Sequence, residues 1–252
     1  MSLQACADVV ARGDPDRFRA AMAAPVAARR VLFPLYAFNV EVARAPWVTA
    51  EPLIAEMRLQ WWIDALAEVE TGAVVRRHEV VTPLAAVLIP SDVPILQRMI
   101  EARRREARRE PLIAAADLAT FASDTAGSLF WVAAHALDRD QDLQVIASRA
   151  QAVGLLSGLA NYFLAVPDFL ARGLNPLPDM TERAFADLID AALAAPAGRA
   201  PTRAQRIAEL PAWRARGILK RARRDPAAVP KGGLEEAPFL RQMALLWAAR
   251  GL

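Results

Sequence analysis

The stretch AQAVGLLSGLANYFLAVP, residues 150–167, decides how this chain folds. It carries no charged residue and is long enough to raise the hypothesis of a membrane-spanning helix. Polar residues such as Ser157 interrupt the apolar run, however, and Ala150, Gly154 and Gly158 recur at every fourth position. Small residues at helical spacing allow a neighbouring helix to approach closely. The sequence therefore predicts that this segment is the central helix of a bundle rather than a membrane span.

Helical patterns also occupy the rest of the chain. Starting signals such as Asp14-Pro15 and stopping signals such as Thr71-Gly72 punctuate them. We expect short helices after Asp14 and Thr82, and longer ones over about 26–45, 49–70, 92–109, 117–137, 140–167, 181–195, 201–224 and 234–250. The helix over 49–70 is expected to have one apolar face formed by Ile54, Met57, Trp61, Ala65, Leu66 and Val69. Because no segment has strand periodicity and no linker separates domains, the sequence predicts an all-α, single-domain fold spanning residues 1–252.

Composition supports a folded chain in a reducing compartment. Hydrophobic residues make up 55% and charged residues 23% of the 252 residues, which is enough apolar material for a buried core. Cys6 is the one cysteine, so it can form no internal disulfide and no cysteine-rich zinc site. Residues 1–13 lack the basic and apolar regions of a secretory signal. We therefore expect a cytoplasmic location.

Motifs for common active sites are missing from the sequence. His78 and His135 lie far apart, and no cluster of histidine, cysteine and carboxylate residues has metal-ligand spacing, so no metal site is predicted. No glycine-rich nucleotide loop or Gly-x-Ser-x-Gly turn occurs either. Asp124 and Ser128 share one face of an otherwise apolar helix. These two side chains either line a cavity or hydrogen-bond inside the bundle.

Two segments, RRVLFPLYAFNVE at 29–41 and EMRLQWWIDAL at 56–66, resemble the squalene/phytoene synthase family. The resemblance continues at 121–137, where FASDTAGSL stands in place of the family's Tyr-x-x-x-Val-Ala-Gly helix, and runs through the Gly154 helix to Leu177-Pro178. It implies an all-helical isoprenoid synthase-like bundle with a central cavity. The residues that the resemblance suggests as cavity lining are Arg30, Tyr36, Asn39, Glu41, Arg58, Trp61, Trp62, Asp64, Asp124, Ser128, Gly154, Gly158 and Asn161.

Enzymes of that family join two prenyl diphosphates head to head, with Mg²⁺ held by aspartates on two facing helices. The resemblance places these motifs at residues without an aspartate, namely Ala43, Arg44 and Trp47 for the first and Ala165 and Phe169 for the second. Glu41 and Asp168 are at most remnants. Since Mg²⁺ requires hard oxygen ligands, both metal clamps are missing, and the usual prenyl transfer is not expected.

The strings AFNVE at 37–41 and MRLQWW at 57–62 are more similar to one branch of the superfamily than to the synthases. That branch contains the mitochondrial respiratory complex I assembly factor and its bacterial relatives. The resemblance then implies a pseudoenzyme without a cofactor that acts as an assembly or lipid-handling factor. Its expected partners are complex I subunits or assembly intermediates, and an anionic membrane surface or an isoprenoid-like lipid is a further candidate. The alternative is a working prenyl transferase that binds Mg²⁺ through an atypical site built from Glu41, Asp64, Asp124 and Asp168.

The segment 199–224 is strongly basic. It has nine arginine and lysine residues, opposed only by Glu209, for a local charge of +8. We expect a basic surface formed by Arg214, Lys220, Arg221, Arg223 and Arg224. Such a surface suits an anionic membrane, with the protein peripheral on the inner membrane, or an acidic partner, although a merely solvated face remains an alternative. Nucleic acid is not expected, because no stacking aromatics or binding motif accompany the charges. The second cluster, 103–109, is balanced by glutamates and is expected to be a solvated helix face.

Overall fold

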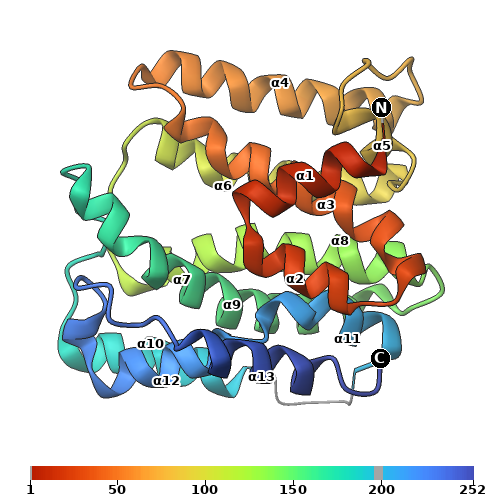
Figure 1. Cartoon of the computed structure of the whole chain (residues 1–252). Helices are drawn as coiled ribbons and strands as arrows, with labels where there is room; N and C mark the ends of the chain where they lie inside the picture. Colours follow the sequence, from red (N-terminus) through yellow and green to blue (C-terminus); the bar gives the residue numbers. More distant parts are fainter. Residues whose placement is uncertain (1, 196–200) are drawn as a thin grey trace.

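The computed structural model describes residues 2–195 and 201–252, so Arg199 of the basic run lies outside the described part. Within that part the chain forms helices and turns without a strand, which confirms the predicted all-α fold (Figure 1). The α-helices are α1 (Leu3–Gly13), α2 (Pro15–Ala23), α3 (Val26–Arg44), α4 (Pro52–Thr71), α5 (Val81–Ala85), α6 (Val93–Ala107), α7 (Ala115–Ala122), α8 (Ser128–Leu137), α9 (Leu143–Ala171), α10 (Glu182–Ala194), α11 (Arg203–Glu209), α12 (Ala215–Arg224) and α13 (Pro238–Ala248). Shorter elements are the 3₁₀ helices η1 (Ala45–Trp47), η2 (Pro90–Asp92), η4 (Leu210–Ala212) and η5 (Pro226–Ala228), and the π-helical segment η3 (Ser123–Gly127).

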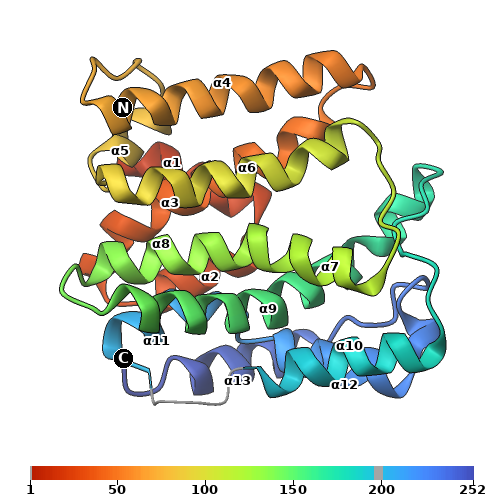
Figure 2. The same cartoon turned by 180° about the vertical axis from the view of Figure 1, so that it is seen from behind.

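The predicted central helix is α9. Figures 1 and 2 show α4 at one end of the molecule and α10, α12 and α13 at the other, with α8 and α9 between them. α9 contacts α7, η3, α8, α10 and α12. Val153, in its first half, belongs to the core formed with the N-terminal helices, whereas Phe163, in its second half, belongs to a core shared with α10 and α12. One helix thus joins the two hydrophobic clusters.

The small residues of α9 lie where a neighbouring backbone approaches, as predicted. A Cβ atom added to Gly154 would lie 2.3 Å from the Cα of Gly127, and one added to Gly158 would lie 2.7 Å from the carbonyl oxygen of Ala122. Among the described residues, α9 is a helix with the length and hydropathy to cross a membrane. The core helix of a bundle has the same composition. Here the glycine face of α9 packs directly against the backbone of α7 and η3.

The buried face of α4 differs from the prediction in its first half. Ile54 and Met57 are exposed, and the structure buries Ala55, Leu59 and Trp62 instead. α4 carries apolar residues on more than one face and packs mainly on α6 and η1, on one side only. Periodicity alone could not choose between these faces, because the choice depends on which side the partner helices occupy.

Candidate functional site

A cavity of about 250 Å³ lies where η1, the end of α6 and the end of α9 meet. We call it the Trp47 pocket. Its lining residues are Trp47, Arg105, Glu106, Arg109, Glu110, Pro111, Leu112, Phe121, Tyr162, Phe169, Leu174, Asn175 and Pro176. Most of this wall is apolar, and arginines and glutamates at the end of α6 supply the charges.

Aromatic rings form a continuous wall of the Trp47 pocket. The ring centroid of Trp47, at the end of η1, lies 5.2 Å from that of Phe169, near the end of α9. Phe169 is followed by Tyr162 at 5.6 Å, and Tyr162 by Phe121 at 5.8 Å. These separations lie in the range of favourable aromatic contacts. The space between η1 and α9 is therefore closed by two rings in contact.

Guanidinium groups lie beside Trp47. Arg109 is 4.5 Å and Arg172 is 5.3 Å from the centre of this ring system, within the range of cation–π attraction. Arg109 has a φ of 58°, the left-handed conformation that non-glycine residues seldom adopt. Its guanidinium donates hydrogen bonds to the carbonyl oxygens of Pro46 at 3.0 Å and Thr49 at 3.3 Å. Arg109 thus ties the end of α6 to η1 and places positive charge at the pocket.

Burial shifts the acid–base properties of two pocket residues. It raises the pKa of the Glu106 carboxyl, although Arg103, which donates a hydrogen bond to it at 2.8 Å, and other arginines oppose the shift. Burial, followed by the charge of Glu106, also raises the pKa of Tyr162. The Tyr162 hydroxyl therefore stays protonated at neutral pH, and it donates a hydrogen bond of 2.6 Å to the carbonyl oxygen of Pro176. This bond holds α9 to the loop that completes the pocket.

The prediction that the 103–109 cluster is a solvated helix face was wrong for part of it. The Arg103 side chain is only 14% exposed and that of Glu106 only 12%. In addition, Arg104 and Arg108 donate hydrogen bonds to Glu56 of α4. The local sequence has balanced charges at helical spacing. That spacing does not encode the long-range contacts by which α4 and Phe121 of α7 cover this face.

Trp47 and Phe169, two of the positions that the resemblance assigns to metal-binding aspartates, both line the Trp47 pocket. Ala43 and Ala165, two others, are partly buried. Across residues 2–195 and 201–252, no group of three or more histidine, cysteine, aspartate or glutamate residues is placed to hold a metal ion. An apolar wall with guanidinium groups at its edge fits an anion attached to an apolar chain better than a cation.

Four of the predicted cavity residues meet at a second cavity, of about 220 Å³. They are Glu41, Arg58, Trp61 and Trp62, and they are joined there by Arg44, Ala45, Val48 and His78. The Trp61 and Trp62 rings are 4.9 Å apart. Glu41 lies 3.7 Å from Arg44, so its carboxylate already has a cationic neighbour.

The remaining predicted residues do not surround one cavity. Tyr36, Asn39 and Ser128 are buried in the bundle, and Gly154 and Gly158 form the helix contact described above. Asn161 borders a polar hole of about 20 Å³, Asp124 is half-buried, and Arg30 and Asp64 are exposed. Burial of Asp124 raises its pKa, and the charge of Arg98 opposes the shift. The central cavity implied by the resemblance is thus mostly filled by side chains at these positions.

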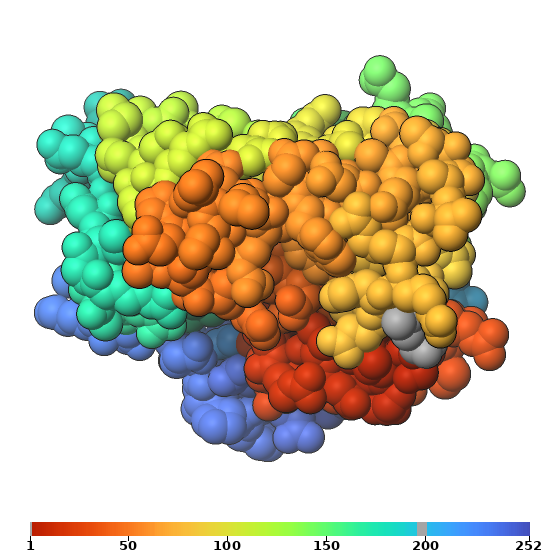
Figure 3. Space-filling model, turned by 90° about the horizontal axis from the view of Figure 1, so that it is seen from above, coloured from red at the N-terminus to blue at the C-terminus, as the bar shows by residue number. Residues whose placement is uncertain are grey.

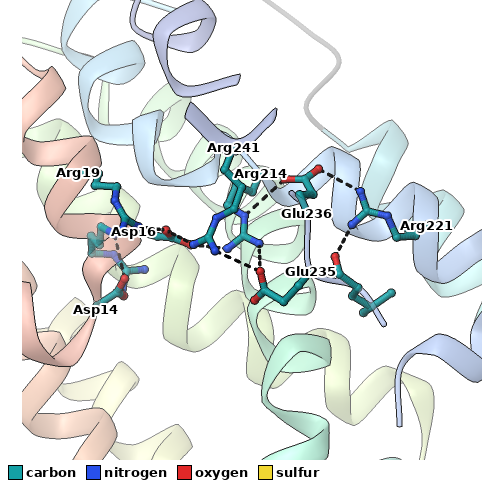
Figure 4. Close-up of polar contacts among 10 residues, drawn as sticks. Asp14, Asp16, Arg19, Arg214, Arg221, Glu235, Glu236 and Arg241 are labelled. Atoms are coloured by element: carbon teal, nitrogen blue, oxygen red, sulfur yellow. Dashed lines mark hydrogen bonds and ion pairs between the residues drawn. The ribbon is translucent and has the colours of Figure 1, made fainter. Parts of the chain in front are cut away.

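The predicted basic surface is wrong in part, because ion pairs with distant residues neutralise much of it. Arg214 is buried, not exposed, and forms ion pairs with Asp16 of α2 and with Glu235 at 2.6 Å (Figure 4). Arg221 pairs with Glu236 at 3.2 Å. These acidic residues are distant in sequence from the basic run, so counting local charge missed them.

On the outer side of α12, Arg223 pairs with Asp190 of α10 at 3.1 Å. Lys220 and Arg224 are exposed, and neither has a carboxylate within ion-pair distance in the part of the chain that the structure describes. The exposed and unpaired part of the predicted basic surface therefore shrinks to these two side chains.

The chain is similar to known proteins in sequence and in fold. Residues 10–244 match the family described as Squalene/phytoene synthase. A solved structure described as a dehydrosqualene synthase in complex with ligand superimposes with a TM-score of 0.70, covering 98% of this chain and 94% of that chain at 16% identity. At that identity the superposition shows a shared fold. A comparison with curated proteins finds no match.

Proposed function

Because this chain belongs to the squalene/phytoene synthase family, we propose that it keeps the fold of these proteins without metal-dependent prenyl transfer and acts as an assembly or lipid-handling factor for respiratory complex I at the membrane. The contact between Trp47 and Phe169 carries the first half of the proposal. Two apolar rings meet where the resemblance implies facing carboxylates. The metal-binding carboxylates are therefore replaced by apolar groups, which is a larger change than a weaker metal site.

The chemistry of diphosphate departure explains why this exchange matters. Negative charge develops on the leaving diphosphate, and clustered Mg²⁺ ions stabilise it in a metal-dependent site. Mg²⁺ is held by hard oxygen ligands, chiefly carboxylates. Tryptophan and phenylalanine provide none, and the two pocket carboxylates, Glu106 and Glu110, already pair with Arg103 and Arg108. The residues present at the Trp47 pocket do not fit a magnesium cluster.

The alternative metal site receives no support from the placement of its four carboxylates. Glu41 borders the second cavity beside Arg44, while Asp64 accepts a hydrogen bond from Gln60 on the exposed side of α4. Asp124 lies in η3, and Asp168 is exposed near the end of α9. A bridged metal cluster needs several carboxylates around one point.

The second half of the proposal combines the pocket with the sequence resemblance. The Trp47 pocket offers an apolar wall and cationic edges, which suit an isoprenoid-like or other anionic lipid. The partner, complex I or its assembly intermediates, comes from the resemblance of residues 37–41 and 57–62 alone. We place the protein in the cytoplasm, peripheral on the inner membrane, where such an assembly step takes place.

Purified protein is expected to bind Mg²⁺ no better than a random protein surface, because the ligands for a metal cluster are replaced by rings. Isothermal calorimetry with Mg²⁺, with and without inorganic diphosphate, checks this expectation. The same protein, incubated with farnesyl or geranylgeranyl diphosphate and Mg²⁺, is expected to yield no condensed product. A stoichiometric, diphosphate-dependent Mg²⁺ site or a condensed product would overturn the proposed loss of prenyl transfer.

Deleting the gene is expected to lower the amount of assembled complex I without changing squalene, hopanoid or carotenoid content. Native gels with an NADH dehydrogenase stain measure the first quantity, and lipid extraction measures the second. A strain complemented with the unmodified gene is the control. Normal complex I with depleted isoprenoids would reverse the proposal in favour of prenyl transfer.

A further inference from the structure

The apolar face of α13 points away from the protein. Phe239, Leu240, Met243, Leu246 and Trp247 recur at helical spacing and are all exposed, Phe239 to 71% and Trp247 to 78%. No residue of this helix is buried. A surface helix ordinarily turns its apolar stripe toward the core. The largest apolar side chains of α13 do the opposite.

Contacts on the other side of the helix hold it in this orientation. Arg241 donates a hydrogen bond of 2.7 Å to Asp16 of α2 (Figure 4). Leu245 and Ala248 pack against the core. In Figure 3 the C-terminal segment, in blue, projects beyond the N-terminal helices at the lower edge of the molecule. The exposed stripe is therefore presented by an anchored helix that projects from the protein.

The C-terminal end of the stripe is cationic. No acidic residue occurs from Pro238 to Leu252. Arg250 follows the stripe one turn after Leu246 and is exposed. Arg206 of α11 lies beside the same end of the helix, because its Nη1 is 4.0 Å from where a Cβ of Gly251 would be. In the described residues neither arginine has a carboxylate within ion-pair distance.

From this arrangement we propose that α13 is the membrane contact of the protein, lying in the surface of a bilayer that contains anionic lipids. Phe239 and Trp247 enter the boundary between headgroups and acyl chains, and Arg250 and Arg206 meet the lipid phosphates. Aromatic and leucine residues on one side with arginines beside them are the composition of interfacial helices. The inference rests on the membrane location proposed above and identifies the element responsible.

Vesicle flotation tests the contact directly. We expect the unmodified protein to float with vesicles of phosphatidylcholine and phosphatidylglycerol, and the double variant Phe239→Ser/Trp247→Ser to bind more weakly by at least about tenfold, since a buried aromatic side chain contributes that much or more to partitioning. The matched control is Leu53→Ser/Met57→Ser on α4, whose side chains are 72% and 64% exposed and lie at the opposite end of the molecule. This control is expected to bind as the unmodified protein does. Both variants should keep its melting temperature, because they alter exposed side chains.

A spectroscopic measurement separates insertion from indirect effects. Brominated lipids should quench part of the tryptophan fluorescence of the unmodified protein, and Trp247→Phe should lose that quenching while still floating. Arg250→Gln combined with Arg206→Gln should weaken binding to anionic vesicles and leave the weak binding to neutral vesicles unchanged.

Equal flotation of both double variants would overturn the inference. So would an unmodified protein that ignores vesicles but forms a dimer that only the α13 variant dissociates, since the stripe would then bind a second copy of the chain. Because flotation uses purified protein and lipid alone, its failure is distinguishable from normal complex I in the deletion strain, which would contradict the proposed function instead.

Discussion

Replacing Gly154 with alanine is expected to destabilise the protein by about 1 to 3 kcal/mol, although alanine is the better helix former by about 1 kcal/mol. The new Cβ would lie 2.3 Å from the Cα and 2.4 Å from the amide nitrogen of Gly127. Backbone atoms cannot rotate away as a side chain can, so α9 and η3 must separate. This separation would disturb both hydrophobic clusters that α9 joins. Thermal and urea unfolding followed by circular dichroism measure the loss.

Gln151→Ala provides the matched control for Gly154→Ala. It places alanine in the same helix at an exposed position, so it changes helix propensity without a clash. Its free energy of unfolding should stay within about 0.5 kcal/mol of the unmodified value. Gly158→Leu should lose at least as much stability as Gly154→Ala, because its Cβ would meet the Ala122 carbonyl oxygen at 2.7 Å. A melting temperature raised by Gly154→Ala would contradict the close packing of α9 on η3.

Replacing Arg214 with methionine is expected to cost about 2 to 4 kcal/mol of stability, since removing one member of a buried ion pair leaves its partners unpaired. The Arg214 side chain is 6% exposed and faces Asp16, Glu235 and Glu236. It thereby ties α2 and α12 to the segment before α13. Because Glu235 is half exposed and Asp16 also has Arg241, the expected loss is below that of a fully buried pair.

The control is the same substitution at an exposed position of α12, the helix that Arg214 precedes. Arg223→Met removes an exposed pair with Asp190, in which the side chains are 45% and 54% exposed. Exposed pairs contribute between 0 and about 1 kcal/mol, so this variant should unfold nearly as the unmodified protein does. We call Arg214, Asp16, Glu235 and Glu236 the Arg214 cluster. Equal losses of stability for Arg214→Met and Arg223→Met would show that this cluster contributes no more than a surface pair.

The Arg214 cluster also predicts a pH dependence of stability. Burial alone would raise the pKa of Asp16, but hydrogen bonds from Arg241 and Arg214 and their charges outweigh it and lower the pKa below the usual 3.8. A carboxylate with a lowered pKa stabilises the fold above its unfolded-state pKa, and this stabilisation disappears as the pH falls through the folded-state value. In Arg214→Met, which lacks this charge, the free energy of unfolding should therefore decrease less steeply as the pH falls below about 4.

For much of the candidate site, the sequence shows only that the expected aspartates are missing. The resemblance alone shows that positions 47 and 169 lack the expected aspartates. It does not show that the Trp47 and Phe169 rings are in contact, with their centroids 5.2 Å apart. Arg109, whose side chain reaches Pro46 and Thr49, was hidden in a cluster of balanced charges. Its left-handed φ of 58° leaves no signal in an arginine-rich helix end. Residues that act through long-range contacts have no local pattern by which to find them.

Local physics explains what the sequence determined by itself. Helix starts such as Asp14-Pro15, the stop at Gly72 and the glycine stripe of α9 depend on neighbours within a few residues, and all appear in the structure as expected. The tertiary structure alone decided which charges are neutralised, which face of α4 is buried and which face of α13 is exposed. These outcomes depend on residues distant in sequence. An apolar stripe indicates a helix face that is favourable to bury, whereas the packing of distant elements decides which face stays exposed.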